Sequence, residues 1–219
     1  MSNGHSIPDL LRIAAPDAIL RWETGEKESV KKVQSAKPLD EKTVSRWKME
    51  WNLRTNIRAG ELAVCLDDLR LWLEQNKDDL SAIIHEEVNK RGGFCGYPAR
   101  ATSILSKFAF TLYPEIAAPY DQHTRRGLSE ISGISAVSLE RDYPLYHREF
   151  DLLADRCYKE LHRTGQTEAL RPFWSPIMSE ILFVRRATDK LLTYIGQGYF
   201  QRMTSIIPPG SVRSVLAKP

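Results

Sequence analysis

Apolar residues recur along this chain at the three- and four-residue steps of an amphipathic helix. No segment alternates apolar and polar residues in the manner of a strand, and no Asn-Gly or Asp-Gly hairpin turn occurs. The pattern therefore predicts an all-α fold. Long helices are expected within 62–73, 101–112, 146–161 and 177–195, and shorter ones within 8–15, 16–22, 40–55, 78–90 and 121–131.

Three regions follow from the same pattern. Residues 1–38 are expected to form an N-terminal arm and linker, 39–205 a helical core, and 206–219 an extended tail rich in Pro and Gly at its start. Segment 24–38 is polar, charged and weakly periodic. It is interpreted either as an exposed linker or as a ragged helix.

Composition places the chain among ordinary globular proteins. It has 219 residues, of which 42% are hydrophobic and 27% charged, so it can bury a sizeable core. Its apolar runs fall short of the roughly 20 residues that cross a bilayer, and its first residues lack the pattern of a secretory signal. We expect a cytoplasmic or nucleoid-associated protein without a membrane partner. The net charge of +3 permits a polyanion partner without requiring one.

Thiols and imidazoles do not suggest a metal or cofactor. The cysteines are odd in number and widely separated, which argues against a disulfide framework and for reduced thiols: Cys65, Cys95 and Cys157. No CxxC or HxxxH pair concentrates the histidines, so no metal site is expected. P-loop, nucleophile-elbow and HExxH motifs are also missing, and no cofactor is expected. Paired charges such as Arg185 and Arg186 are expected on exposed helix faces.

One stretch, 91–128, carries more pointed chemistry. Gly93 and Gly96 flank a tight turn just before a helix start, where unpaired backbone N–H groups favour an anion such as a phosphate. An ordinary glycine turn between two helices is the alternative.

Asp121 follows a proline-rich connector and precedes another helix start, QHTRRGL. Aspartate at this position is a good N-cap, worth about 1 kcal/mol, and that structural duty alone could explain it. A carboxylate kept ionised by the same N–H donors could instead stabilise an oxocarbenium ion in the sugar of a flipped nucleotide and orient the attacking water.

The order of these parts resembles a known family. Gly96, then SILSKFAF, a connector and APYDQHTRRGL are similar to the core of the helix-hairpin-helix DNA glycosylases, whose D-x-[HN]-x-x-R element reads here from Asp121 to Arg126. The resemblance covers about thirty-five of the 219 residues. It implies a two-lobed helical body, with the 8-oxoguanine-glycosylase-like branch as the nearest relative. It also implies duplex DNA with a modified base as the partner and Asp121 as the catalytic carboxylate.

Lys107 is the second catalytic candidate. Bifunctional glycosylases carry a lysine directly after the hairpin, where this chain has residues 97–100, and Lys107 lies about two turns further along beside Ser103 and Thr111. The structural alternative is a lysine exposed to solvent on the polar face of its helix. An ion pair with Asp121 or a phosphate contact is favoured over attack by the amine.

Further residues of the segment are candidates for contacts with nucleic acid. Expected phosphate contacts, besides the glycine turn, are Arg100, His123, Arg125 and Arg126. Expected base-pocket residues are Phe94, Tyr97, Tyr120 and Trp174. A solvated face for the charged residues and core packing for the aromatic ones are the structural alternatives.

The sequence thus supports two main hypotheses. The first is a base-excision glycosylase that hydrolyses an N-glycosidic bond. The second is a non-catalytic helical interaction module, such as a subunit of a defence or regulatory complex, with a protein partner. An enzyme for free nucleotides or nucleosides is a third option.

Overall fold

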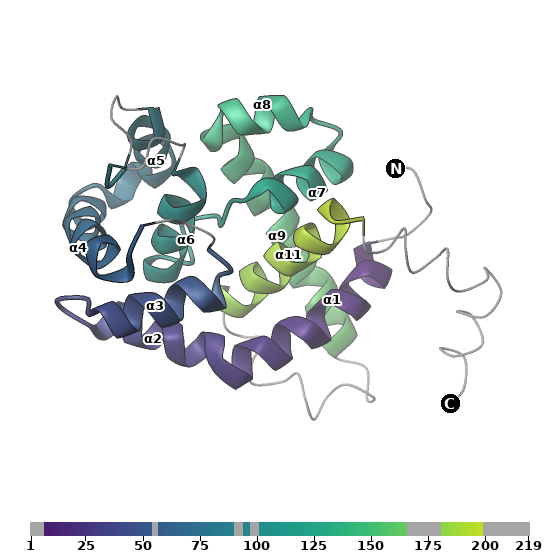
Figure 1. Cartoon of the computed structure of the whole chain (residues 1–219). Coiled ribbons are helices and arrows are strands. Elements are labelled where there is room, and N and C mark those ends of the chain that lie inside the picture. Colours follow the sequence, from purple (N-terminus) through teal and green to yellow (C-terminus); the bar gives the residue numbers. More distant parts are fainter. Residues whose placement is uncertain (1–6, 54–56, 90–93, 97–100, 166–180, 199–219) are drawn as a thin grey trace.

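The computed structural model describes residues 7–53, 57–89, 94–96, 101–165 and 181–198. Throughout these ranges the regular elements are helices, and no strand occurs among them (Figure 1). The all-α fold class predicted from the sequence is confirmed.

The helices match the periodic segments closely. The long apolar patterns correspond to α4, α6, α9 and α11, whereas 8–15 and 16–22 form one helix despite Pro16 in its interior. The elements in chain order are α1 (Ile7–Arg21), the π-helical η1 (Trp22–Glu26), α2 (Lys27–Ser35), α3 (Glu41–Glu50), α4 (Ala59–Gln75), the 3₁₀ turn η2 (Lys77–Asp79), α5 (Leu80–Asn89), α6 (Thr102–Leu112), α7 (Gln122–Ser132), α8 (Ala136–Arg141), α9 (Tyr143–Gly165) and α11 (Ile181–Gly196).

The helices pack in two groups (Figure 1). In the first group α2, α3, α4, α5 and α6 contact one another, and in the second α1, α7, α8, α9 and α11 do. The groups are joined where η1 links α1 to α2 and where α5 packs against α9. This arrangement agrees with the expected two-lobed body, and it does not test the resemblance to a particular family.

Residues 7–35, within the segment expected to be an arm and a linker, belong to the helical body. α1 packs on α11 and α9, and α2 packs on α3 and α6. Trp22, Glu26, Val30 and Val33 are buried along this run. The ragged-helix interpretation of 24–38 therefore describes the segment better than an exposed linker does.

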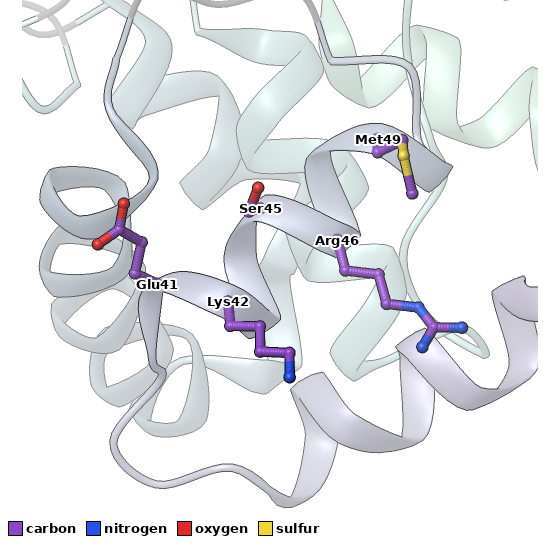
Figure 2. A pocket seen from close by; sticks show the side chains of 5 residues that line it. All are labelled: Glu41, Lys42, Ser45, Arg46 and Met49. Carbon is purple, nitrogen blue, oxygen red and sulfur yellow. The ribbon is translucent and has the colours of Figure 1, made fainter.

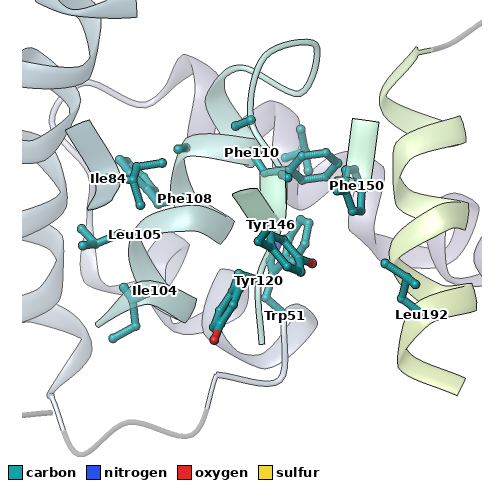
Figure 3. Close-up of a cluster of buried hydrophobic side chains, with 14 of the residues drawn as sticks. Trp51, Ile84, Ile104, Leu105, Phe108, Phe110, Tyr120, Tyr146, Phe150 and Leu192 are labelled. Atoms are coloured by element: carbon teal, nitrogen blue, oxygen red, sulfur yellow. The ribbon is translucent and has the colours of Figure 1, made fainter. Parts of the chain in front are cut away.

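The central element is α6. Its residues are buried on nearly every side. Phe108 lies edge-on to Trp47, at 5.7 Å between ring centroids. Phe110 lies edge-on to Trp51, at 5.6 Å, and both of these residues are labelled in Figure 3. A buried polar atom without a partner is costly, and Ser106, Lys107 and Thr111 on this helix each have one. For example, Thr111 accepts a hydrogen bond from Trp47 Nε1 at 3.0 Å.

α7 and α11 approach each other closely at two glycines. A Cβ atom added to Gly127 would collide with the backbone oxygen of Leu192, and one added to Gly196 would collide with that of His123. Only glycine leaves room for backbone at these points. The helix that begins at Asp121 is therefore fixed directly against α11.

Two of the cysteines are paired, contrary to the expectation of reduced thiols. Cys65 on α4 and Cys95 in the glycine turn form a disulfide with Cα atoms 5.9 Å apart, while Cys157 is free and buried. A separation of 30 residues carries no signal for this pairing, because the fold alone brings the turn onto α4. In the part of the chain that the structure describes, no helix has the length and apolar character needed to span a membrane.

Candidate functional site

Asp121 begins α7 as its N-cap. Its Oδ1 accepts hydrogen bonds from the backbone N–H groups of His123 at 2.8 Å and Thr124 at 2.9 Å. Thr124 returns the contact, because its Oγ1 accepts from the Asp121 N–H at 2.8 Å. This reciprocal pair is a capping box, so the predicted helix start is confirmed.

The other carboxylate oxygen of Asp121 faces Lys107. The Lys107 Nζ lies 3.0 Å from Asp121 Oδ2 and 3.4 Å from the backbone oxygen of Trp51. The Lys107 side chain is only 6% exposed, whereas that of Asp121 is 26% exposed. The ion pair, which was favoured only over attack by the amine, is present. The solvated lysine, which the helical pattern favoured first, is wrong, because other helices cover α6 on the side that the pattern assigned to water.

These contacts keep the Asp121 carboxyl ionised. Burial raises its pKa, but the charge of Lys107 and the hydrogen bonds from Thr124, Lys107 and His123 lower it by more, so the net pKa lies below its usual value. The site is thus an ionised carboxylate, reached by solvent on one side and held by an ammonium on the other.

A cluster of buried charges lies behind this pair. Arg186 on α11 binds Glu26 of η1 through two hydrogen bonds, of 2.8 and 2.7 Å, and also binds Asp189. The Arg186 guanidinium sits 4.1 Å from the centroid of the Trp51 ring. Because the backbone oxygen of Trp51 lies near Lys107, Trp51 contacts both the buried-charge cluster and the Lys107–Asp121 pair.

Burial sets the protonation of the cluster. It raises the pKa of Asp189, an effect to which the charge of Asp121 adds, and it lowers the pKa of Lys190 to about 8 with help from Arg186. Burial also acts to raise the pKa of Glu26, but Arg186 and Lys190 outweigh it and the net pKa is lowered.

The expectation that Arg185 and Arg186 lie on an exposed face is wrong, because both are buried. Arg185 binds the backbone oxygen of Ala117 at 2.6 Å and pairs with Asp151 at 2.7 Å. Their burial could have been inferred from the sequence, because both arginines lie within the apolar repeat of α11, a pattern that favours the interior over the surface.

The basic residues of α7 divide into different environments. Arg125 is largely buried and pairs with Glu140 at 2.6 Å, and it donates to the Tyr120 hydroxyl at 3.3 Å. Arg126 is exposed, whereas His123 is half-buried with a buried Nδ1 that finds no partner in the described ranges. Arg126 is therefore the best placed of the three for a phosphate contact.

The glycine turn is only partly described. Cys95 and Gly96 both adopt positive φ, 55° and 68°, and Phe94 is buried. Gly93, Tyr97, Arg100 and Trp174 lie outside the described residues. A phosphate grip at this turn stays a prediction.

The two described aromatic candidates pack in the core. Tyr120 is buried and lies edge-on to Tyr146, at 4.9 Å between ring centroids (Figure 3). It also lies edge-on to Tyr143, at 6.3 Å. Phe94 is also buried. The base-pocket prediction gains nothing at these positions, and core packing, the alternative, accounts for both.

An open hollow elsewhere does not coincide with the predicted site. It has a volume of about 640 Å³ and is lined from α3 by Glu41, Lys42, Ser45, Arg46 and Met49 (Figure 2). None of these residues belongs to the segment around Asp121. Among the residues that the structure describes, no group of three or more His, Cys, Asp and Glu side chains is arranged to hold a metal ion.

The fold and the site define an all-α protein with a paired, partly exposed carboxylate at a helix start. No protein-family model, curated protein or solved structure matches this chain. Its function must be inferred from the site itself.

Proposed function

We propose that the chain is a nucleic-acid-binding protein that hydrolyses the N-glycosidic bond of a modified base, with Asp121 as the catalytic carboxylate. One observation carries the proposal. The Asp121 side chain is 26% exposed, yet Lys107 at 3.0 Å and the N–H groups of α7 keep it ionised.

Such a carboxylate suits glycosidic chemistry. As the bond between C1′ and the base nitrogen breaks, positive charge develops on the sugar, and an ionised acid held by fixed donors stabilises that charge. Water then adds its oxygen to C1′, and its proton passes to solvent while the departing base is protonated. Because Lys107 fixes Oδ2, this geometry assigns the lysine the role of counter-ion.

Duplex DNA is the proposed partner. Arg126 on α7 is exposed and lies five residues after Asp121, and it is the proposed phosphate contact. The N–H groups of His123 and Thr124 are already bound by Asp121. The net charge of +3 is compatible with a polyanion. Binding should therefore weaken steeply with added salt, because phosphate contacts release counterions.

The test is base release from a panel of duplex oligonucleotides, each carrying one modified base, and from the matching free nucleosides. We expect the wild-type protein to release at least one base from the polymer and Asp121→Asn to release it at least about a hundredfold more slowly. Release by both proteins at equal rates, or from no substrate in the panel, contradicts the proposal.

The role of Lys107 is tested on the same substrate by strand nicking and by reductive trapping with borohydride. As a counter-ion, Lys107 forms no trapped adduct, and Lys107→Gln slows base release without changing the product. A wild-type adduct that Lys107→Gln abolishes would instead assign attack by the amine.

A second candidate function is a non-catalytic helical interaction module. One observation favours it: each Asp121 oxygen already has a partner and Lys107 is almost fully buried, so helix capping and pairing account for both. This module would not show salt-dependent binding to duplex DNA, so a titration at low and moderate salt separates the candidates.

A further inference from the structure

The connector that leads to Asp121 has an unusual environment. Its backbone from Ile116 to Tyr120 runs between helices without a strand partner, and Ala117 and Ala118 are fully buried. Buried carbonyl groups need donors. In this connector the donors come from side chains of α9 and α11.

Three successive carbonyl oxygens are bound this way. Arg185 Nη2 donates to Ala117 at 2.6 Å, Tyr143 Oη donates to Ala118 at 2.6 Å, and Tyr146 Oη donates to Pro119 at 2.7 Å. The carbonyl before them, at Ile116, lies 2.8 Å from His147 Nε2.

The two tyrosines are rigid donors. Their rings stack with centroids 6.0 Å apart, and Tyr120 packs edge-on against both. Burial raises the pKa of each phenol well above its usual value, so both hydroxyls keep their protons and donate throughout the neutral range. The Tyr146 hydroxyl also interacts with the Thr124 side chain, which completes the Asp121 cap.

α6 holds the connector from the opposite side. Ser106 Oγ accepts a hydrogen bond from the backbone N–H of Tyr120 at 3.1 Å. Lys107, which follows Ser106, binds the carboxylate of Asp121, which follows Tyr120. Two adjacent residues of α6 thus match two adjacent residues of the connector. A displacement of the connector that breaks the first contact therefore also moves Asp121 relative to Lys107.

We propose that Tyr146 and Ser106 are positioning residues that hold the connector from opposite sides and so place the Asp121 carboxylate against Lys107 for the reaction. Neither residue touches the reacting atoms. The catalytic use of this placement rests on the proposed function, whereas the placement itself does not.

The experiment is a ¹³C NMR titration of the Asp121 carboxyl in the full chain. In Tyr146→Phe and Ser106→Ala the Lys107–Asp121 contact loosens, so the pKa of Asp121 rises by about 0.5 relative to wild type. Tyr158→Phe is the matched control, because Tyr158 lies on the same helix with its side chain exposed. Its Asp121 pKa equals that of wild type.

A second measurement is the single-turnover rate of base release. Because misplacement of a catalytic group by about 1 Å costs about a hundredfold in rate, we expect Tyr146→Phe and Ser106→Ala to lose tenfold or more while DNA affinity stays within about twofold. The NMR titration decides the positioning role even if no base is released, so failure of the proposed function is recognised separately. Should Tyr146→Phe not fold, Ser106→Ala decides alone. An unchanged Asp121 pKa in the folded variants, even with reduced thermal stability, overturns the proposal.

Discussion

At the scale of single residues, Asp121 and Lys107 differ in how much water each can reach. Lys107 is buried and forms its ion pair with Asp121, whereas Asp121 retains solvent and two backbone donors when Lys107 is removed. Breaking a buried pair is most costly when it leaves the buried charge alone. Replacing Asp121 is therefore expected to cost more unfolding free energy than replacing Lys107.

The first prediction concerns that inequality. Asp121→Asn lowers the free energy of unfolding by about 3 kcal/mol, because it removes the carboxylate that pairs with the buried Lys107. Lys107→Met costs about 1 kcal/mol or less, because a methionine fills similar space. Denaturant titration at pH 7 measures both. In the double variant the cost is close to that of Lys107→Met alone, and equal costs for the two single variants would contradict the asymmetry.

The second prediction is the pH dependence of the same pair. The folded-state pKa of Asp121 is lowered, so its contribution to stability is fully present above the unfolded value of about 3.9 and is lost as the pH falls through the folded value. The gap in unfolding free energy between wild type and Asp121→Asn should thus narrow as the pH falls from 6 to about 3. A gap that stays constant over that range would show that the carboxylate contributes no charge-dependent stability.

Residues differ in how visible their roles are in the sequence. Asp121 was identifiable as a cap because a short acid preceded a helical pattern. The reciprocal contact with Thr124 was found only in the structure. The burial of Lys107 was hidden, since helical periodicity assigns a lysine beside Ser103 and Thr111 to water. Only the packing of other helices on α6 reverses that assignment.

At the scale of elements, the contact between α7 and α11 decides where Asp121 lies. Both helices were predicted from periodicity, but their close approach was not. In the sequence, Gly127 and Gly196 are only residues of low helix propensity. Helix α8 was also missed. This helix is short, and its N-cap is Ser135, whose side chain accepts a hydrogen bond from the backbone N–H of Ser138.

The third prediction tests the helix contact. Gly127→Ala places a methyl group against the backbone oxygen of Leu192, so we expect a loss of about 3 kcal/mol in unfolding free energy, in the range of overpacked cores. Gly133→Ala is the matched control. It has open space around it and only its positive φ of 76° to oppose a side chain, a cost of about 1 kcal/mol. Similar losses in the two variants would contradict a backbone contact at Gly127.

At the scale of the whole molecule, pairings between residues distant in the sequence hold the helices together. Glu26 and Arg186 are 160 residues apart in sequence, and Cys65 and Cys95 are 30 apart. Neither pairing has a local pattern. The fold class and most helices were therefore predictable, while the buried charges and the disulfide required the tertiary structure.

The fourth prediction concerns the disulfide. Unfolding the protein without reductant should expose one reactive thiol per chain, Cys157, and unfolding with reductant should expose all 3 cysteines. In the native protein Cys157 should react slowly, because burial raises its pKa to about 11. Cys65→Ser should lower the unfolding free energy by about 3 kcal/mol, because the unfolded chain gains conformational entropy when the disulfide is absent. Three reactive thiols without reductant would contradict the pairing.

The proposed function requires Asp121 to be more than a helix cap. Asparagine is as good an N-cap as aspartate, so Asp121→Asn preserves the start of α7 and removes only the negative charge. The most direct measurement is single-turnover release of the modified base from duplex DNA with both proteins saturating. We predict binding within about twofold and release slower by a hundredfold or more in Asp121→Asn. Equal release by the two proteins would leave Asp121 a structural cap and contradict the account.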